Sequence, residues 1–261
     1  MPPGRIAFYA ATAGVSVLSA RAILLEPPPL VWAILAAVAY VALLLSGVLV
    51  LRLRVFVDAV VRGPKGARGV ALTFDDGPDT KWTRRVLDLL DSANAKATFF
   101  VIARKAEADP DLVREIVARG HAIGMHSYDH DRLFSLRSER RVRADLERAI
   151  ATLTKITGER PMLFRPPIGH TNPSIARVAD ALDLTVVGWS LSARDGLRGA
   201  DPKCVAIRVR SKLVDRAIVL MHDAAERGDH EPAGPRALPE ILGAIADAGL
   251  SVVPLSHWIE E

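Results

Sequence analysis

The sequence predicts an α/β barrel of about seven parallel strands, preceded by an N-terminal transmembrane region. Three observations support this fold class. Residues 30–51 form an uncharged apolar stretch, short β-type runs alternate with amphipathic segments from Gly69 onward, and polar side chains follow several of those runs. Strands joined by long crossover connections run parallel, so their carboxyl ends meet at one edge of the sheet.

The apolar residues near the amino end predict one or two membrane-spanning helices. Leu30–Leu51 is long enough to cross the hydrocarbon core, and Trp32 stands near its start, where an interfacial aromatic residue belongs. The preceding segment, Ile6–Leu25, reaches spanning length only if Arg21 extends toward the lipid surface. A signal peptide cleaved near Ala20–Ala22 is the alternative.

The charge distribution indicates a membrane rather than a nucleic acid as partner. The net charge is +4, but the densest basic cluster directly follows the apolar stretch, where such residues mark the cytoplasmic side and favour anionic lipid. No nucleic-acid-binding motif is recognised, and Cys204 is the single cysteine, so no internal disulfide is expected. We expect a membrane region at 1–51, a basic linker at 52–68 and a globular domain at 69–261.

Seven β-type runs alternate with six amphipathic segments in the globular domain. The expected strands are Val70–Phe74, Ala97–Ile102, Ala122–Met125, Met162–Arg165, Thr185–Trp189, Ala217–Met221 and Ser251–Pro254. The expected helices are Trp82–Ala93, Pro110–Arg119, Glu139–Thr157, Pro173–Leu182, Pro202–Leu213 and Arg236–Ala248.

The polar residues after these strands favour a barrel over an open doubly wound sheet. "DD" follows the first strand, "HSYDH" the third, "RPPIGH" the fourth, "SARD" the fifth and "MHD" the sixth. Side chains at the ends of so many strands converge only if those ends form a ring.

The paired histidines of "HSYDH" indicate a metal site. His126 and His130 are four residues apart, so one helical turn would direct both imidazoles the same way. With one carboxylate of the Asp75–Asp76 pair they supply two nitrogens and one oxygen, which leaves a position for water, as in hydrolytic zinc sites. Surface histidines also occur at this spacing by chance, but the acid pair at the same end of the sheet favours the metal site.

The remaining strand-end residues fit acid–base chemistry. If Asp76 binds the metal, Asp75 can take a proton from water, and Arg165 can hold that carboxylate ionised. His222 could then protonate a leaving amine, and Asp195 could orient its ring through a hydrogen bond.

Five stretches resemble the motifs of polysaccharide deacetylases with the NodB homology domain, carbohydrate esterase family 4. They are "TFDDGP" (73–78), "HSYDH" (126–130), "RPPIG" (165–169), "WSLSARD" (189–195) and "LMHD" (220–223), in the family's order. The resemblance covers about residues 69–256. It implies a distorted (β/α) barrel and a hydrolase that removes an N-acetyl or N-formyl group from an amino sugar.

The resemblance implies the same roles as the chemistry above. They are Asp75 as base, Asp76, His126 and His130 as ligands of one divalent metal, expected to be Zn²⁺, Arg165 as the partner of the base, and Asp195 as the residue that positions the acid His222. It also implies that the backbone N–H of Ile168 stabilises the oxyanion, and that Pro167 and Leu220 line the substrate pocket.

Three positions depart from the family pattern. Ile168 replaces the usual tyrosine, Ser192 the usual aspartate, and Gly196 the usual tryptophan, which removes one apolar wall of the acyl pocket. An inactive glycan-binding membrane protein is therefore one alternative function. An aspartyl phosphatase is another, although such enzymes separate their two acids by one residue and have no use for "HSYDH".

The expected topology bears on the substrate. If both apolar segments span, Arg5 and the basic linker lie on one side, which the positive-inside rule makes the cytoplasmic face of a bacterial-type inner membrane. A domain tethered there can reach an N-acylated amino sugar on a membrane lipid carrier but not the cell wall. We therefore expect a lipid-linked substrate, with exported peptidoglycan or a chitin-like polysaccharide as the alternative.

Overall fold

The computed structural model describes residues 1–228 and 230–259. Within these residues, eight strands form one sheet in the order β1-β6-β5-β4-β3-β2-β8-β7, and every ladder is parallel. The strands are β1 (Ala59–Val60), β2 (Ala71–Asp75), β3 (Thr98–Val101), β4 (Ala122–Met125), β5 (Leu163–Phe164), β6 (Thr185–Val187), β7 (Leu191–Ser192) and β8 (Ile218–His222). The predicted parallel α/β fold is confirmed.

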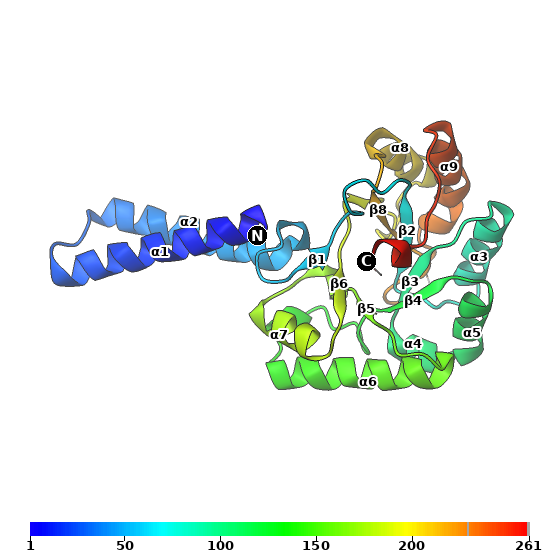
Figure 1. Ribbon diagram of the computed structural model, residues 1–261, viewed down its shortest axis with the longest axis horizontal. Helices are drawn as coiled ribbons and strands as arrows, with labels where there is room; N and C mark the ends of the chain where they lie inside the picture. Colours follow the sequence, from blue (N-terminus) through cyan, green and yellow to red (C-terminus); the bar gives the residue numbers. More distant parts are fainter. Residues whose placement is uncertain (229, 260–261) are drawn as a thin grey trace.

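Helices surround the outside of this curved sheet, as Figure 1 shows. They are α3 (Trp82–Ser92), α4 (Ala103–Ala108), α5 (Pro110–Ala118), α6 (Glu139–Thr157), α7 (Pro173–Ala181), α8 (Pro202–Lys212) and α9 (Gly234–Asp247). Four short 3₁₀ turns complete the described elements: η1 (Leu51–Leu53), η2 (Phe134–Leu136), η3 (Pro167–Gly169) and η4 (Leu255–Trp258).

The sheet is a half-barrel rather than a closed ring. In the described part of the chain, no ladder joins its edge strands β1 and β7. The segment after β1 instead reaches the start of β8, where Arg62 and Ala217 form an isolated antiparallel bridge and the Gly63 N–H donates to the Arg216 carbonyl at 3.0 Å. These contacts satisfy backbone groups that an open edge would leave unpaired.

One predicted strand is wrong and three elements were missed. Ser251–Pro254 makes only one parallel bridge, between Val252 and Val70, because Pro254 lacks an N–H and the chain turns into η4. The strands β1 and β7 and the helix α4 were not predicted. The expected basic linker contains β1, and its Val57 is buried, so this segment is part of the folded domain.

The centre of the sheet explains why the strands are continuous apolar runs. All five residues of β2 are buried, and Phe74 stacks on Phe99 of β3 with ring centroids 5.1 Å apart. Helices cover the outer face of these strands and buried side chains fill the inner face, so both faces exclude water. Asp75 ends β2 at the edge where the functional side chains gather.

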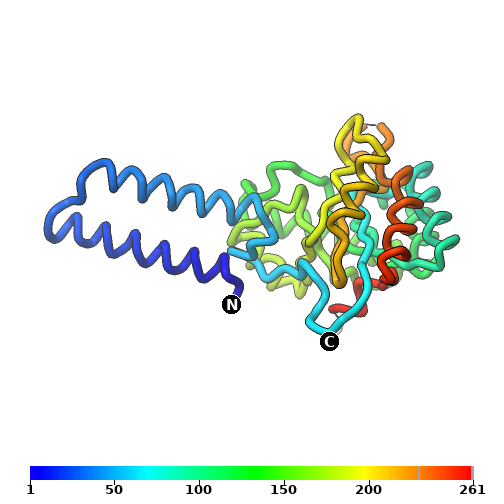
Figure 2. The backbone as a smooth tube through the Cα atoms, turned by 90° about the horizontal axis from the view of Figure 1, so that it is seen from above, coloured from blue at the N-terminus to red at the C-terminus, as the bar shows by residue number. Residues whose placement is uncertain are grey.

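The amino end forms a helical hairpin that extends away from the half-barrel (Figure 2). Its helices, α1 (Pro3–Leu24) and α2 (Leu30–Leu49), are each long and apolar enough to cross a membrane. The end of α2 contacts the domain directly, because the Thr171 N–H donates to the Val48 carbonyl at 3.0 Å. Arg5 pairs with Asp58 at 3.0 Å, so the first residues of α1 lie at the same end of the hairpin as the domain.

Candidate active site

The two adjacent aspartates occupy different backbone conformations. Asp75 is the last residue of β2, whereas Asp76 has φ +74°, in the left-handed region that non-glycine residues seldom adopt. This change of direction separates the two carboxylates, so each contacts different partners. Backbone strain of this kind is often found at functional sites.

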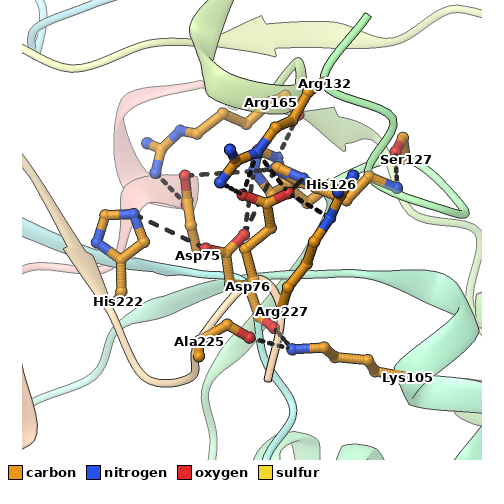
Figure 3. Close-up of polar contacts among 12 residues, drawn as sticks. Asp75, Asp76, Lys105, His126, Ser127, Arg132, Arg165, His222, Ala225 and Arg227 are labelled. Carbon is orange, nitrogen blue, oxygen red and sulfur yellow. Dashed lines mark hydrogen bonds and ion pairs between the residues drawn. The ribbon is translucent and has the colours of Figure 1, made fainter. Parts of the chain in front are cut away.

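Asp76, His126 and His130 form a buried triad. Figure 3 labels its members Asp76 and His126. Asp76 Oδ1 lies 3.7 Å from His126 Nε2 and 3.5 Å from His130 Nε2, and the two Nε2 atoms are 3.1 Å apart. One potential ligand atom from each residue thus falls within a sphere that a single ion can occupy. The structure brings together the three residues predicted as ligands.

The local geometry of the histidines differs from the prediction. Residues 126–130 form a loop after β4 rather than a helical turn, with Ser127 at φ +64° and His130 at φ +53°. The His130 N–H donates to Ser127 Oγ at 3.0 Å, which stabilises this turn. The two imidazoles converge because of these backbone angles, and the four-residue spacing alone does not account for it.

The donor set and its surroundings fit a divalent cation. Asp76 Oδ1 is buried and has no hydrogen-bond partner among the described residues. Burial raises the pKa of Asp76 to about 7, His222 opposes this shift, and the Asp75 carboxylate adds to it. A cation would satisfy the orphaned oxygen and relieve the repulsion between the two acids.

Asp75 is held by a completely buried arginine. Arg165 Nη1 donates to Asp75 Oδ1 at 2.6 Å and to Thr73 Oγ1 at 2.9 Å, and Nη2 donates to the Gly188 carbonyl at 3.0 Å. The guanidinium also lies over the ring of Phe100, 4.1 Å from its centroid. Burial lowers the pKa of Arg165, but the contact with Asp75 opposes that shift.

His222 and Asp195 form the second polar pair of the site. Asp195, which is completely buried, accepts the His222 backbone N–H through Oδ2 at 2.7 Å, and its Oδ1 lies 3.0 Å from His222 Nδ1. Burial alone would lower the pKa of His222, but the charge and hydrogen bond of Asp195 raise it to about 10. His222 Nε2 lies 4.0 Å from Asp76 Oδ2, so this ring borders the triad.

A cavity of about 430 Å³ opens over these groups. Asp76, both histidines of the triad and His222 contribute to its wall. Ile168 also lines it, with its backbone at φ +50°, which is strained for a β-branched residue. Pro167 and Leu220 are buried and do not belong to the cavity wall in the described structure, so their role in the substrate pocket stays a prediction.

The structure explains why glycine replaces the family's usual tryptophan at position 196. A Cβ atom at this position would lie 2.9 Å from His222 Nδ1, so the backbone passes directly against the imidazole. A tryptophan could not occupy this backbone without displacing the ring or the loop. Ser192 is half-buried and lines the same cavity.

Three further residues support the site but were not singled out from the sequence. Lys105 Nζ donates to the carbonyls of Asp76 and Ala225, at 2.8 and 2.6 Å, and so ties together the loops after β2 and β8. Glu226 and Arg132 form a pair beside His130. No motif marks these residues, although Glu226 comes three positions after "MHD".

The triad offers three protein ligands, whereas structural zinc sites use four, so a metal held here would suit hydrolytic chemistry. The fold and this site define a class of metal-assisted hydrolases, which the comparisons with known proteins test. The sequence model of the family described as polysaccharide deacetylase matches residues 62–187. A Bacillus cereus peptidoglycan-N-acetylglucosamine deacetylase is 32% identical over 198 residues, which cover 76% of this chain and 70% of that protein.

Two further comparisons also match polysaccharide deacetylases. Listeria monocytogenes PgdA, a peptidoglycan-N-acetylglucosamine deacetylase, is 36% identical over 159 residues, 61% of this chain and 33% of the Listeria protein. The crystal structure of the Bc1960 peptidoglycan N-acetylglucosamine deacetylase superposes with a TM-score of 0.71 at 31% identity, covering 76% of this chain and 91% of that one. The chain belongs to the polysaccharide deacetylase family of hydrolases.

Proposed function

We propose that this protein removes the acetyl group from an N-acetylated amino sugar. The observation that carries the proposal is the position of two differently held groups beside the Asp76–His126–His130 triad: Asp75 contacts it from below the cavity that the triad lines, and His222 lines the same cavity. Amide hydrolysis needs a group that activates water and another that protonates the leaving nitrogen. An N-formyl sugar would use the same groups.

Asp76, His126 and His130 are the residues that would hold the metal, and their nitrogen and oxygen donors fit Zn²⁺. When bound, such an ion lowers the pKa of water and polarises the amide carbonyl. Burial lowers the pKa values of both histidines. Neutral rings are the form that a metal ligand requires.

Asp75 is the proposed base. Its Oδ1 is engaged by Arg165, while Oδ2 lies 3.7 Å from His126 Nε2 and so faces the triad. The buried guanidinium donates to Oδ1 only, which leaves Oδ2 available to accept a proton. Thr73 and Gly188 fix the guanidinium, so the direction of the base is set before substrate binds.

His222 is the proposed acid. Its raised pKa of about 10 keeps the ring protonated at neutral pH, and Asp195 holds Nδ1, which leaves Nε2 to deliver a proton to the leaving amine. We also propose that the backbone N–H of Ile168 stabilises the oxyanion, since Ile168 lies on the wall of the same cavity.

The test is acetate release by the purified full-length chain from N-acetylglucosamine oligomers. Acetate release that needs an added divalent metal supports the proposal. Asp76→Ala is the matched variant that should lose both metal and activity. A wild-type protein that binds Zn²⁺ but releases neither acetate nor formate from any amino sugar would favour the inactive glycan-binding alternative.

We propose a lipid-linked amino sugar as the substrate, and the hairpin is the observation that favours it. Arg5 and the basic residues after α2 lie at the same end of the hairpin as the cavity-bearing domain. If both helices span, the positive-inside rule puts that end in the cytoplasm. The printed names of the relatives instead support exported peptidoglycan as the alternative substrate.

A reporter fusion separates these two substrates. Alkaline phosphatase fused after Glu261 folds actively only outside the cytoplasm. An inactive phosphatase in an intact fusion, together with deacetylation of a polyprenyl-linked amino sugar, is the expected result. A strongly active phosphatase would overturn the cytoplasmic topology and make peptidoglycan the substrate.

A further inference from the structure

The two triad histidines direct their ring nitrogens toward similar neighbours. Each directs Nε2 toward Asp76, and each has an oxygen next to Nδ1. His126 Nδ1 donates to the Arg165 carbonyl at 2.6 Å, whereas His130 Nδ1 lies 3.2 Å from Glu226 Oε1. The oxygen next to His126 is a backbone carbonyl, which any residue at that position would supply. The oxygen next to His130 belongs to a side chain from the loop after β8.

Glu226 is fixed in this position by arginines. Arg132 forms a two-pronged contact with its carboxylate, at 2.9 Å to Oε1 and 2.6 Å to Oε2, and Arg227 Nε lies 3.2 Å from Oε1. Figure 3 shows both arginines beside the triad. The Glu226 side chain is only 12% exposed, so the carboxylate faces the protein rather than solvent.

The direction of the proposed contact follows from the arginines. Arg132 donates to both oxygens of the Glu226 carboxylate, and Arg227 Nε lies 3.2 Å from Oε1, so Glu226 is placed as an acceptor. His130 Nδ1, 3.2 Å from Oε1, is then the nitrogen that carries the ring proton toward Glu226. The Nε2 lone pair then points at Asp76, as a metal ligand requires.

We propose that Glu226 is the positioning residue for the metal ligand His130, with Arg132 holding it in place. The inference rests on the proposed metal site. It adds two residues outside the five motifs that hold a metal ligand in place. His130 Nδ1 is buried without a hydrogen bond among the described residues, and Glu226 Oε1, 3.2 Å away, is an acceptor that a modest rotation of the ring would bring into line. The pair also links the loop after β4 to the loop after β8.

The experiment measures Zn²⁺ affinity of the detergent-solubilised full chain by chelator competition. Glu226→Gln should weaken binding about 10- to 100-fold, the range typical of such supporting partners. Arg132→Gln keeps the Glu226 carboxylate but removes the arginine that holds it. This variant should weaken Zn²⁺ binding by less than Glu226→Gln does. Glu231→Gln is the matched control, because the Glu231 carboxylate accepts a hydrogen bond from Arg236 on the same segment and is not part of the metal triad.

A second readout does not depend on metal. In the metal-free protein with ¹⁵N-labelled histidine, His130 should carry its proton on Nδ1, and Glu226→Gln should shift that population toward the other tautomer. The His130→Gln variant identifies the ¹⁵N signals of His130, because only those signals disappear from its spectrum. These shifts report the ring's protonation, which a purely structural role of Glu226 would leave unchanged.

The outcomes separate this inference from the function on which it rests. If the wild type binds no metal, the proposed function fails. If the wild type binds Zn²⁺ and Glu226→Gln binds it within twofold with an unchanged His130 tautomer, only the role of Glu226 is overturned.

Discussion

Replacing Asp195 with asparagine tests the proposed acid most directly. Asp195 is completely buried, and both of its oxygens face His222, one toward Nδ1 and one toward the backbone N–H. Asparagine has nearly the same shape and can still accept the backbone N–H. The substitution therefore removes a charge beside the ring with little change in packing.

The size of the effect follows from the pKa of His222. Burial would lower it, yet the folded value is about 10 because of Asp195 and, to a smaller extent, Asp76 and Asp75. The rise from 6.5 corresponds to about 5 kcal/mol in favour of the protonated ring. Without Asp195 the pKa should fall to its ordinary value of 6.5 or below it, because burial is then less opposed, which leaves at most about 3% of the ring protonated at pH 8 instead of about 99%.

The assay is the pH dependence of kcat/KM for acetate release between about pH 6 and pH 10. The wild type should lose activity only as the pH rises through about 10, because the proton remains bound below that value. The variant should lose activity at a pH several units lower than the wild type and be at least about 30-fold slower at pH 8. Asp201→Asn is the matched control, since Asp201 caps α8 away from the cavity.

An alkaline limb at the same pH in Asp195→Asn and wild type would refute the reasoning. So would an equal loss of activity at every pH, because a structural defect lowers the rate uniformly. Thermal unfolding of the variant checks that the fold is retained.

Three other predictions follow from the same structure. Asp75→Asn should lower turnover at least about a hundredfold while Zn²⁺ affinity by chelator competition is kept, and a fully active variant would exclude Asp75 as the base. Gly196→Ala puts a Cβ against the His222 ring, so kcat should fall without loss of metal; an unchanged kcat would show that the loop moves freely. Phe99→Ala removes a fully buried ring stacked on Phe74 and should lower the free energy of unfolding by about 3–5 kcal/mol in urea denaturation, against less than about 1 kcal/mol if the site can collapse.

The sequence by itself determined the elements with strong local signals. The helix expected at Glu139–Thr157 has the same bounds in the structure, because its apolar periodicity is regular and Gly158 ends it in a left-handed conformation. The seven candidate catalytic and metal residues lie at strand ends or in the loops that follow. Parallel strands bring such positions together whatever the details of packing.

The tertiary structure decided what depends on partners distant in the sequence. The two residues of β1 are a strand only because they pair with Val186 and Val187 of β6, and Ser251–Pro254 fails as a strand because its pairing with Val70 ends after one bridge. The support that Glu226 gives His130 joins residues 96 positions apart, beyond the reach of any local pattern. Periodicity reports which face of an element is buried, whereas short edge pairings and side-chain contacts between loops form only after the whole sheet has set their distances.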